Sequence, residues 1–247
     1  MSWGFLLLLA ALPAAAAPSA ARLEEANKLY EASRFAEAAT IYQTLLSESP
    51  HSAVLHYNLG NARFRQGGPG ALGKAIASYL RAFRLDPRDA DARANLDYAL
   101  RRAGEELVPA GMPPTLFVAY NLASAAELAA LFWTAFWAAC LLGAGAFLAP
   151  RAKAALRTAA LSAAALGLLA GSWWALRRSS GFKAPAVVLL QDAEVRSGPG
   201  ENFPVSFKVP EGRRVERLDA KAAWSEIGVP REGLKGWILK DALEAVD

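Results

Sequence analysis

Two long runs without a charged residue constrain the fold of this chain more than any other feature of its sequence. Residues 128–148 and 158–176 contain no Asp, Glu, Lys or Arg. As α-helices they would each be about 30 Å long, which matches the hydrocarbon core of a bilayer. A short basic turn with Arg151, Lys153 and Arg157 separates them. A buried soluble hairpin is the alternative, but two such runs around a basic turn favour a two-helix transmembrane hairpin over residues 124–178.

The remainder of the chain has the composition of soluble modules. Apolar residues make up 54% and charged residues 20% of the sequence, which excludes a disordered chain. The 27 Lys and Arg outnumber the 23 Asp and Glu only slightly, and they are dispersed along the chain. We therefore expect no nucleic-acid partner, and a mixture of soluble modules with a few membrane segments.

A shorter apolar segment begins the chain. Residues 1–13 are mostly apolar and precede an alanine run, which is the pattern of a secretory signal peptide with cleavage near residues 16–21. The segment is too short for an independent span, although an uncleaved anchor is the alternative. Assigning 1–21 as a signal peptide implies that the basic turn is cytoplasmic. Both soluble parts then face the exterior side, which is the periplasm in a bacterium with two membranes.

Residues 22–103 have a helical pattern that occurs twice. In each copy a small residue is followed by an aromatic residue four positions later, then by Ala or Leu, then by Pro. The first copy has Ala38, Tyr42, Leu45 and Pro50, and the second has Ala75, Tyr79, Ala82 and Pro87. Small residues allow antiparallel helices to approach closely, and proline stops the second helix. The pattern predicts an all-α repeat.

This pattern resembles the tetratricopeptide repeat, a short helix–turn–helix unit that stacks on its neighbours. The most specific match is Leu59-Gly-Asn-Ala62 followed by Arg81-Ala-Phe-Arg-Leu-Asp-Pro87. Residues 89–102 are typical of a capping helix, and the Pro- and Gly-containing residues 104–123 are predicted to form a linker. About two repeats plus a capping helix make a short array, so we expect it to rely on a partner or on the membrane.

The resemblance implies a peptide-binding groove on the first helices of the repeats. Asn27 and Asn61 occupy the position at which peptide-binding members bond to a ligand backbone, since an amide supplies both a donor and an acceptor. The expected neighbours in this groove are Tyr30, Tyr57, Phe64 and Arg65. The positions of the family's carboxylate clamp hold Leu23, Asp91 and Asn95, so no terminal carboxylate is expected to bind. A helix–helix hydrogen bond is the alternative role; it is favoured for Asn27, and both roles stay open for Asn61.

From residue 184 to the end, the hydropathy pattern changes to a period of two. Short strands between Gly and Pro turns predict a small all-β barrel over residues 184–247. Val195-Arg-Ser-Gly-Pro-Gly200, Trp224 and Gly236-Trp237-Ile238 are similar to the bacterial SH3-like domain. The resemblance implies binding to the cell wall or to a protein. Trp224 and Trp237 are candidates for a ligand surface, although we expect at least one of them to belong to the core.

No catalytic, metal-binding or cofactor-binding motif is visible. The sequence has no Gly-x-Ser-x-Gly, His-Glu-x-x-His or Walker-type glycine loop. Cys140 lies within an apolar run, and it forms no recognised metal-ligand spacing with His51 and His56. We therefore expect a protein that is not an enzyme and that needs no cofactor.

The order of the predicted parts resembles the BatE-type proteins of the bacterial aerotolerance (Bat) gene cluster. This resemblance covers nearly the whole chain and rests on architecture. It implies a scaffold in the inner membrane that works beside von Willebrand-type membrane proteins and a MoxR-type ATPase. We expect a non-enzymatic adaptor that binds protein partners through its repeats and its SH3-like domain. The alternative is an envelope sensor or anchor whose SH3-like domain binds peptidoglycan, with repeats that are only structural.

Overall fold

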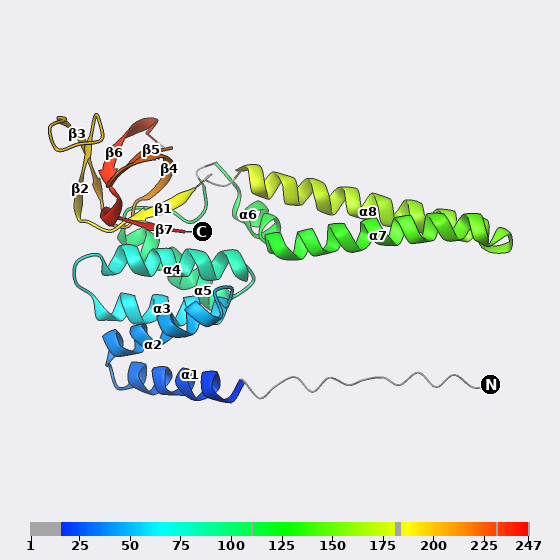
Figure 1. Ribbon diagram of the computed structural model, residues 1–247, viewed down its shortest axis with the longest axis horizontal. Coiled ribbons are helices and arrows are strands. Elements are labelled where there is room, and N and C mark those ends of the chain that lie inside the picture. Colours follow the sequence, from blue (N-terminus) through cyan, green and yellow to red (C-terminus); the bar gives the residue numbers. More distant parts are fainter. Residues whose placement is uncertain (1–15, 110, 181–183, 231, 247) are drawn as a thin grey trace.

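The computed structural model describes residues 16–109, 111–180, 184–230 and 232–246. The described residues form eight α-helices and a C-terminal antiparallel sheet. Helices α1–α5 are stacked, the sheet lies beside α4, and the α7–α8 pair projects from this body (Figure 1). Most of the predicted signal peptide lies outside the described residues, and its last residues belong to the first turns of α1.

The first five helices form two antiparallel hairpins and one further helix, which we call the helical unit. Their bounds are α1 (Ala16–Glu31), α2 (Phe35–Glu48), α3 (Ala53–Gln66), α4 (Ala71–Leu85) and α5 (Ala90–Arg102). The side chain of Ser52 caps α3, and that of Asp89 caps α5 by accepting two backbone N–H bonds. The expected all-α repeat pattern is therefore present as five helices.

Small residues set the spacing between these helices. Ala26, Ala38, Ala62 and Ala75 are fully buried. A Cβ at Gly60 would lie 2.6 Å from ring carbons of Tyr79, so glycine is what allows α3 and α4 to approach this closely. The tyrosine ring fills the space that the small side chain leaves.

The sheet contains seven strands, which we call the β unit. They are β1 (Pro185–Val188), β2 (Asp192–Arg196), β3 (Val205–Pro210), β4 (Arg214–Lys221), β5 (Trp224–Val229), β6 (Leu234–Leu239) and β7 (Leu243–Ala245). Their order is β3-β2-β6-β5-β4-β1-β7, with every pair antiparallel. The sheet is not closed into the barrel that the sequence predicted, because β7 pairs only with β1. Arginines of α4 bind the carbonyls of Ala245 and Val246 instead.

The β unit packs against the helical unit and shares its core. Val187 of β1 and Val246 after β7 are buried in one cluster with Ile76, Leu96 and Leu100. A Cβ at Gly73 would lie 2.4 Å from the carbonyl oxygen of Val188, so α4 and β1 are in close contact. The short repeat stack is thus covered by the chain's own sheet.

Ion pairs reinforce this junction. The carboxylate of Glu244 accepts two 3.1 Å hydrogen bonds from Arg81 and lies 3.6 Å from Arg63. Glu105, only 3% exposed, binds Arg214 at 2.8 Å and Arg213 at 3.4 Å. Buried charges are costly unless they are paired, and each of these carboxylates has two cationic partners.

The segment expected to be a linker is packed against the helical unit. It contains α6 (Pro114–Tyr120), and its side chains Leu107 and Phe117 are buried in the shared core. The ring of Phe117 stacks on that of Phe83, with centroids 6.2 Å apart. This packing fixes the base of the hairpin to the body.

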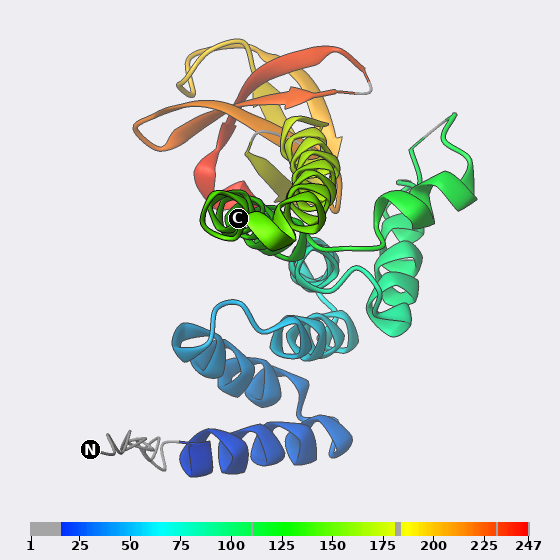
Figure 2. The ribbon, with the colours of Figure 1, turned by 90° about the vertical axis from the view of Figure 1, so that its right-hand side faces the viewer.

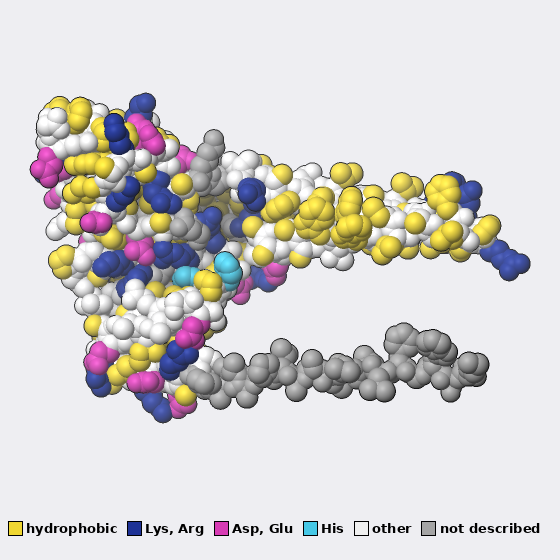
Figure 3. Space-filling view, in the orientation of Figure 1, with side chains coloured by type: hydrophobic (Ala, Val, Ile, Leu, Met, Phe, Trp, Pro, Cys, Tyr) yellow, Lys and Arg dark blue, Asp and Glu magenta, His cyan; other side chains and the backbone are white. Residues whose placement is uncertain are grey.

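Two long helices, α7 (Ala125–Leu148) and α8 (Lys153–Ser180), form the projecting hairpin around the 3₁₀ turn Pro150–Ala152. Both are long and apolar enough to cross a membrane, and little of their surface is buried. Hydrophobic side chains cover the hairpin, and Lys and Arg side chains lie at its tip (Figure 3). Gly171 lies against the ring of Phe132, so this glycine serves packing within the hairpin.

Candidate functional site

Two sets of side chains recur at the interval of one repeat on α1, α3 and α5. The first set is Asn27, Asn61 and Asn95, and the second is Tyr30, Phe64 and Tyr98. Members of one set are equally spaced in the sequence and occupy equivalent positions on successive helices of the stack. The repeat spacing therefore lines one side of the helical unit with amides and aromatic rings.

Two adjoining hollows lie along this side. One has a volume of about 200 Å³ and is lined by Asn27, Tyr30, Glu31, Tyr42, Asn58 and Asn61. The other has a volume of about 230 Å³ and is lined by Tyr30, Asn61, Phe64, Arg65, Tyr79, Asn95 and Tyr98. Because Tyr30 and Asn61 border both hollows, the two form one surface, which we call the groove.

Hydrogen bonds orient the asparagines of the groove. The hydroxyl of Tyr42 donates to Oδ1 of Asn27, and that of Tyr79 donates to Oδ1 of Asn61, each at 2.7 Å. Asn95 Nδ2 donates to the same Asn61 oxygen at 2.9 Å. Among the described residues, none accepts a hydrogen bond from Nδ2 of Asn27 or Asn61. These amide donors are therefore available to a ligand.

The two tyrosines are protonated at neutral pH and act as donors, and burial makes their ionisation still less favourable. Burial raises the pKa of Tyr42 to about 12, with smaller contributions from Tyr30 and Glu31. Burial also raises the pKa of Tyr79 well above the ordinary value. A protonated phenol can donate to the amide oxygen. This bond orients the asparagine side chain and leaves its NH₂ group without an internal acceptor in the part of the chain that the structure describes.

Ring contacts hold the aromatic side chains in place. Phe64 and Tyr98 meet edge to face at 5.8 Å, and the Arg102 guanidinium lies 5.5 Å from the Phe64 ring centroid. At the other end, Arg65 lies 5.4 Å from the ring centroid of Phe35. Such contacts restrict the rotamers of exposed side chains and prepare the surface for binding.

Five of the six residues predicted for the groove line it: Asn27, Tyr30, Asn61, Phe64 and Arg65. Tyr57 does not line either hollow, but its hydroxyl accepts a 3.2 Å hydrogen bond from Asn95. The sequence prediction did not include Asn95 and Tyr98 in the groove. They follow Asn61 and Phe64 by the spacing that separates Asn27 from Asn61, and this is the signal that identifies them.

The two predicted tryptophans of the β unit lie on one face of the β5–β6 pair. Trp224 is opposite Leu239 and Trp237 is opposite Glu226, whereas Ile227 belongs to the other face and to the core. Trp224 is 9% exposed and lines a hollow of about 560 Å³. This hollow also contains Asp192, Glu194, Arg196 and Glu201. Trp237 is half-buried and does not line it.

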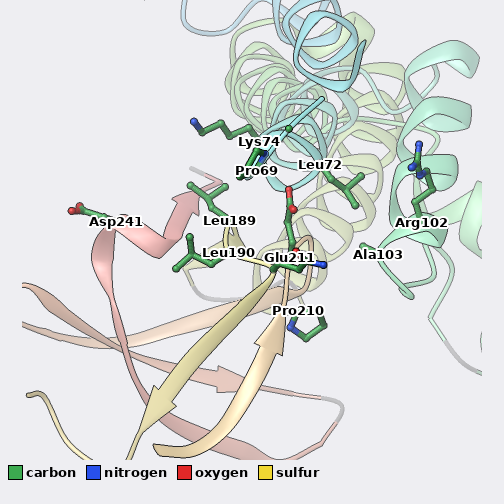
Figure 4. Close-up of a pocket in the computed structure, with 13 residues that line it drawn as sticks. Pro69, Leu72, Lys74, Arg102, Ala103, Leu189, Leu190, Pro210, Glu211 and Asp241 are labelled. Carbon is green, nitrogen blue, oxygen red and sulfur yellow. The ribbon is translucent and has the colours of Figure 1, made fainter. Parts of the chain in front are cut away.

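A larger hollow of about 720 Å³ lies at the junction of the helical and β units (Figure 4). Glu211 lies at its centre, but its carboxylate accepts a 3.0 Å hydrogen bond from the backbone N–H of Gly73. A carboxylate is favourable at a helix N-terminus, so Glu211 caps α4. Lys74, Arg102 and Asp241 lie at separate edges of the hollow. These charged groups do not converge on one point.

The described residues contain no cluster of three or more His, Cys, Asp or Glu side chains that could hold a metal ion. The buried His56 has its Nε2 3.0 Å from the carbonyl oxygen of Pro50. Burial lowers the pKa of His56, and the neighbouring Arg81 and Arg63 lower it further, although the Pro50 contact opposes this. His56 therefore supports the inter-repeat turn as a neutral side chain.

Comparisons with known proteins give one short likeness. No family model matches the chain. It is similar to the probable cell wall amidase LytH of two strains of Staphylococcus epidermidis, with 31% identity over 52 residues in each case. The likeness covers 21% of this chain and only 18% of the length of those relatives. It is a partial match, and it does not define the family of the whole chain.

Proposed function

We propose that this protein is a membrane-anchored, non-enzymatic scaffold that binds an extended segment of a partner protein in the groove. The observation that carries this proposal is the pair of repeated sets, one of amides and one of rings, along the groove. Neighbouring helices pack about 8–10 Å apart. Three residues of an extended chain cover about 10 Å, so each repeat would contact about three ligand residues.

The chemistry of the groove suits a peptide backbone. Nδ2 of Asn27 and of Asn61 can donate to ligand carbonyls while their oxygens stay bound to tyrosines. Tyr30, Phe64 and Tyr98 would contact the ligand's side chains. The asparagines would bind the ligand through its backbone, and the rings would contact many kinds of side chain. Binding of this kind depends weakly on the ligand's sequence.

In this proposal the helical unit is a pair of tetratricopeptide repeats with α5 as capping helix, and the β unit is SH3-like. The hairpin anchors both to the bacterial inner membrane, on the periplasmic side. Since a hairpin returns the chain to the side from which it came, both units lie at the same end of α7 and α8 (Figure 1). By the resemblance to BatE-type proteins, the partner is a von Willebrand-type membrane protein of the same system. Holding two binding surfaces on one anchor raises their effective concentration for such a partner.

Photo-crosslinking in cells tests the groove. A photoreactive residue at Tyr98 is preferable to one at Asn61, because Tyr98 is 54% exposed whereas Asn61 accepts two internal hydrogen bonds. The matched control is the exposed Gln43 of α2, which lines neither hollow. We expect one dominant protein adduct from position 98 and none from position 43. Equal recovery from the two positions, in a correctly inserted protein, overturns the proposal.

The alternative function is binding of peptidoglycan by the β unit. The hollow beside Trp224, which is lined by three carboxylates and Arg196, is the observation that favours it. Sedimentation of the full chain, in detergent, with purified sacculi tests it. The variant Asp192→Asn alters the exposed wall of this hollow, and Glu37→Gln on α2 is the matched control. Binding that Asp192→Asn alone weakens supports the alternative, and failure of the parent protein to sediment excludes it.

A further inference from the structure

An uncharged segment precedes the hairpin. Between Glu106 and Glu127 there is no Asp, Glu, Lys or Arg. At its centre lies α6, whose Phe117 is buried in the shared core. Leu116 and Val118 of α6 are 56% and 45% exposed, and Leu122, which follows the helix, is 54% exposed. A water-exposed connection normally carries charges, so three exposed apolar side chains on an uncharged segment suggest a contact with lipid or protein.

Contacts on both sides hold α6 in place. Phe117 stacks on Phe83 of α4, which fixes α6 to the helical unit. Asn121, directly after α6, accepts a 3.1 Å hydrogen bond from Arg177 of α8, and this guanidinium also lies 5.3 Å from the ring centroid of Tyr120. The exposed apolar side chains are therefore presented in a fixed orientation beside the base of the hairpin.

Aromatic rings on the hairpin mark the depth of a membrane. Phe132, Trp133 and Trp174 form a ring cluster across α7 and α8, with centroids 5.1 Å and 6.2 Å from that of Phe132. At about 1.5 Å per residue, Phe132 lies about 27 Å along the helix from the tip at Pro150. This length matches a hydrocarbon core of about 30 Å, and Trp is enriched at its boundary.

The same reasoning places α6 near this boundary. The first residue of α7, Ala125, lies about 10 Å beyond Phe132 on the body side. A core of about 30 Å measured from the tip ends about 3 Å beyond Phe132, so Ala125 lies about 7 Å outside the core, at the outer edge of a headgroup region about 5–7 Å thick. Helix α6 ends only a few residues before Ala125. Viewed along the hairpin from its tip, α6 lies beside the α7–α8 pair (Figure 2). Arg177 of α8, which donates a hydrogen bond to Asn121, connects the end of α6 to the base of the hairpin.

We propose that α6 lies in the body-side interface of the membrane that the hairpin crosses, with Leu116, Val118 and Leu122 against lipid. This inference rests on the proposed membrane span. The contact is apolar, since residues 107–126 carry no charge that could bind a headgroup electrostatically. Through Phe117, the interfacial α6 sets the orientation of the helical unit, and with it the groove, relative to the membrane.

Site-directed spin labelling tests this placement. Cys140 is the only cysteine, so Cys140→Ser gives a background for single labels in the full chain. Nitroxides are attached at Val118→Cys and Leu122→Cys, both exposed positions. Leu141→Cys, 71% exposed on α7, reports on the span, and Val205→Cys, 40% exposed on β3, reports on water. β3 lies at the end of the molecule opposite the hairpin (Figure 1).

The measurement is power saturation in vesicles of phosphatidylethanolamine and phosphatidylglycerol, with oxygen and with a water-soluble nickel complex. We expect the nickel accessibility at positions 118 and 122 to be several-fold lower than at position 205, with oxygen accessibility retained. A value at 118 and 122 equal to that at 205, with a lipid profile at 141, overturns the placement of α6 alone. A water profile at 141 overturns the membrane span itself. Loss of both oxygen and nickel accessibility at 118 and 122 means that protein covers α6, and this also overturns the inference.

Discussion

The hydroxyl of Tyr79 donates a 2.7 Å hydrogen bond to Oδ1 of Asn61, and Tyr42 makes the same bond to Asn27 one repeat earlier. The two tyrosines lie slightly further apart in the sequence than the two asparagines, because the second hairpin has extra residues in its turn near Gly68. The insertion therefore lengthens the turn without altering the pair that orients the groove. This relationship makes the two tyrosines positioning residues for the asparagines.

Removing the hydroxyl of Tyr79 tests the strength of this pair. Tyr79→Phe keeps the ring against Gly60 but removes one donor to Asn61, so we expect a loss of about 1 kcal/mol in the free energy of unfolding. Tyr57→Phe is the matched control, because that hydroxyl contributes only a 3.2 Å contact to Asn95. Thermal unfolding in detergent micelles, followed by circular dichroism, compares the two variants. Equal stabilities for both would contradict the role assigned to Tyr79.

The Glu244 carboxylate should contribute strongly to the junction between units. Glu244→Gln removes the charge that compensates Arg63 and Arg81, whose side chains are 10% and 19% exposed. Leaving partly buried cations without a carboxylate should cost about 1–3 kcal/mol. The control is Glu37→Gln, since the exposed Glu37–Arg34 pair should contribute little. Limited proteolysis reports on release of the β unit, and no difference between the variants would refute the prediction.

Gly73 should be the position of α4 that tolerates a side chain least. Its Cβ would lie 2.4 Å from the Val188 carbonyl oxygen, so Gly73→Ala must push β1 away from α4. We expect a cost of about 1–3 kcal/mol, as for other overpacked sites. Gly143→Ala is the matched helical control, because nothing described lies within 4 Å of its added Cβ. Hydrogen exchange of the β1 amides measures the effect, and unchanged protection in Gly73→Ala would falsify this contact.

Sequence periodicity predicted the helices other than α6, the two candidate spans and the strands, because these depend on local patterns. Proline at positions 50 and 87 follows α2 and α4 closely, and the turn glycines near position 68 precede α4. The docking of the β unit was not predictable in this way. The bond between Arg81 and Glu244 joins residues 163 positions apart, and the repeat motif that contains Arg81 does not indicate a partner near the C-terminus. At the β7 edge of the sheet, Arg81 and Arg84 of α4 donate hydrogen bonds to the carbonyls of Ala245 and Val246.

The groove was predictable in part for a similar reason. Asn27 and Asn61 were found through the repeat, but only packing shows that their oxygens bind Tyr42 and Tyr79. The extension of the groove to α5 requires that the helix after the second repeat continue the same spacing. A single sequence displays this spacing, yet only the stacked helices show that Asn95 reaches Asn61.

Stability should fall as the pH falls through the range in which histidine titrates. His56 is buried, and burial together with Arg81 and Arg63 lowers its pKa from the ordinary value of 6.5. Below that value the unfolded chain binds a proton that the folded chain excludes, so stabilisation present above pH 6.5 is lost on acidification. The difference between the melting temperatures at about pH 7.5 and about pH 5 measures this dependence of stability on pH. His56→Gln should reduce this pH dependence, and an unchanged pH dependence in His56→Gln would exclude His56 as its source.

The basic tip of the hairpin should lie on the opposite side of the membrane from the β unit. Arg151, Lys153 and Arg157 are at one end of α7 and α8, and the body lies at the other. In the sequence, Arg177, Arg178 and Lys183 follow the second uncharged run at the other end of the hairpin, so the count of basic residues nearly ties. The predicted signal peptide breaks this tie and implies a cytoplasmic tip. In the Cys140→Ser background, a membrane-impermeant thiol reagent applied to spheroplasts should label Val205→Cys and spare Ala152→Cys. Both cysteines should react after the membrane is permeabilised. Labelling of position 152 alone in intact spheroplasts would reverse the orientation, and labelling of both would show that the hairpin does not cross the membrane.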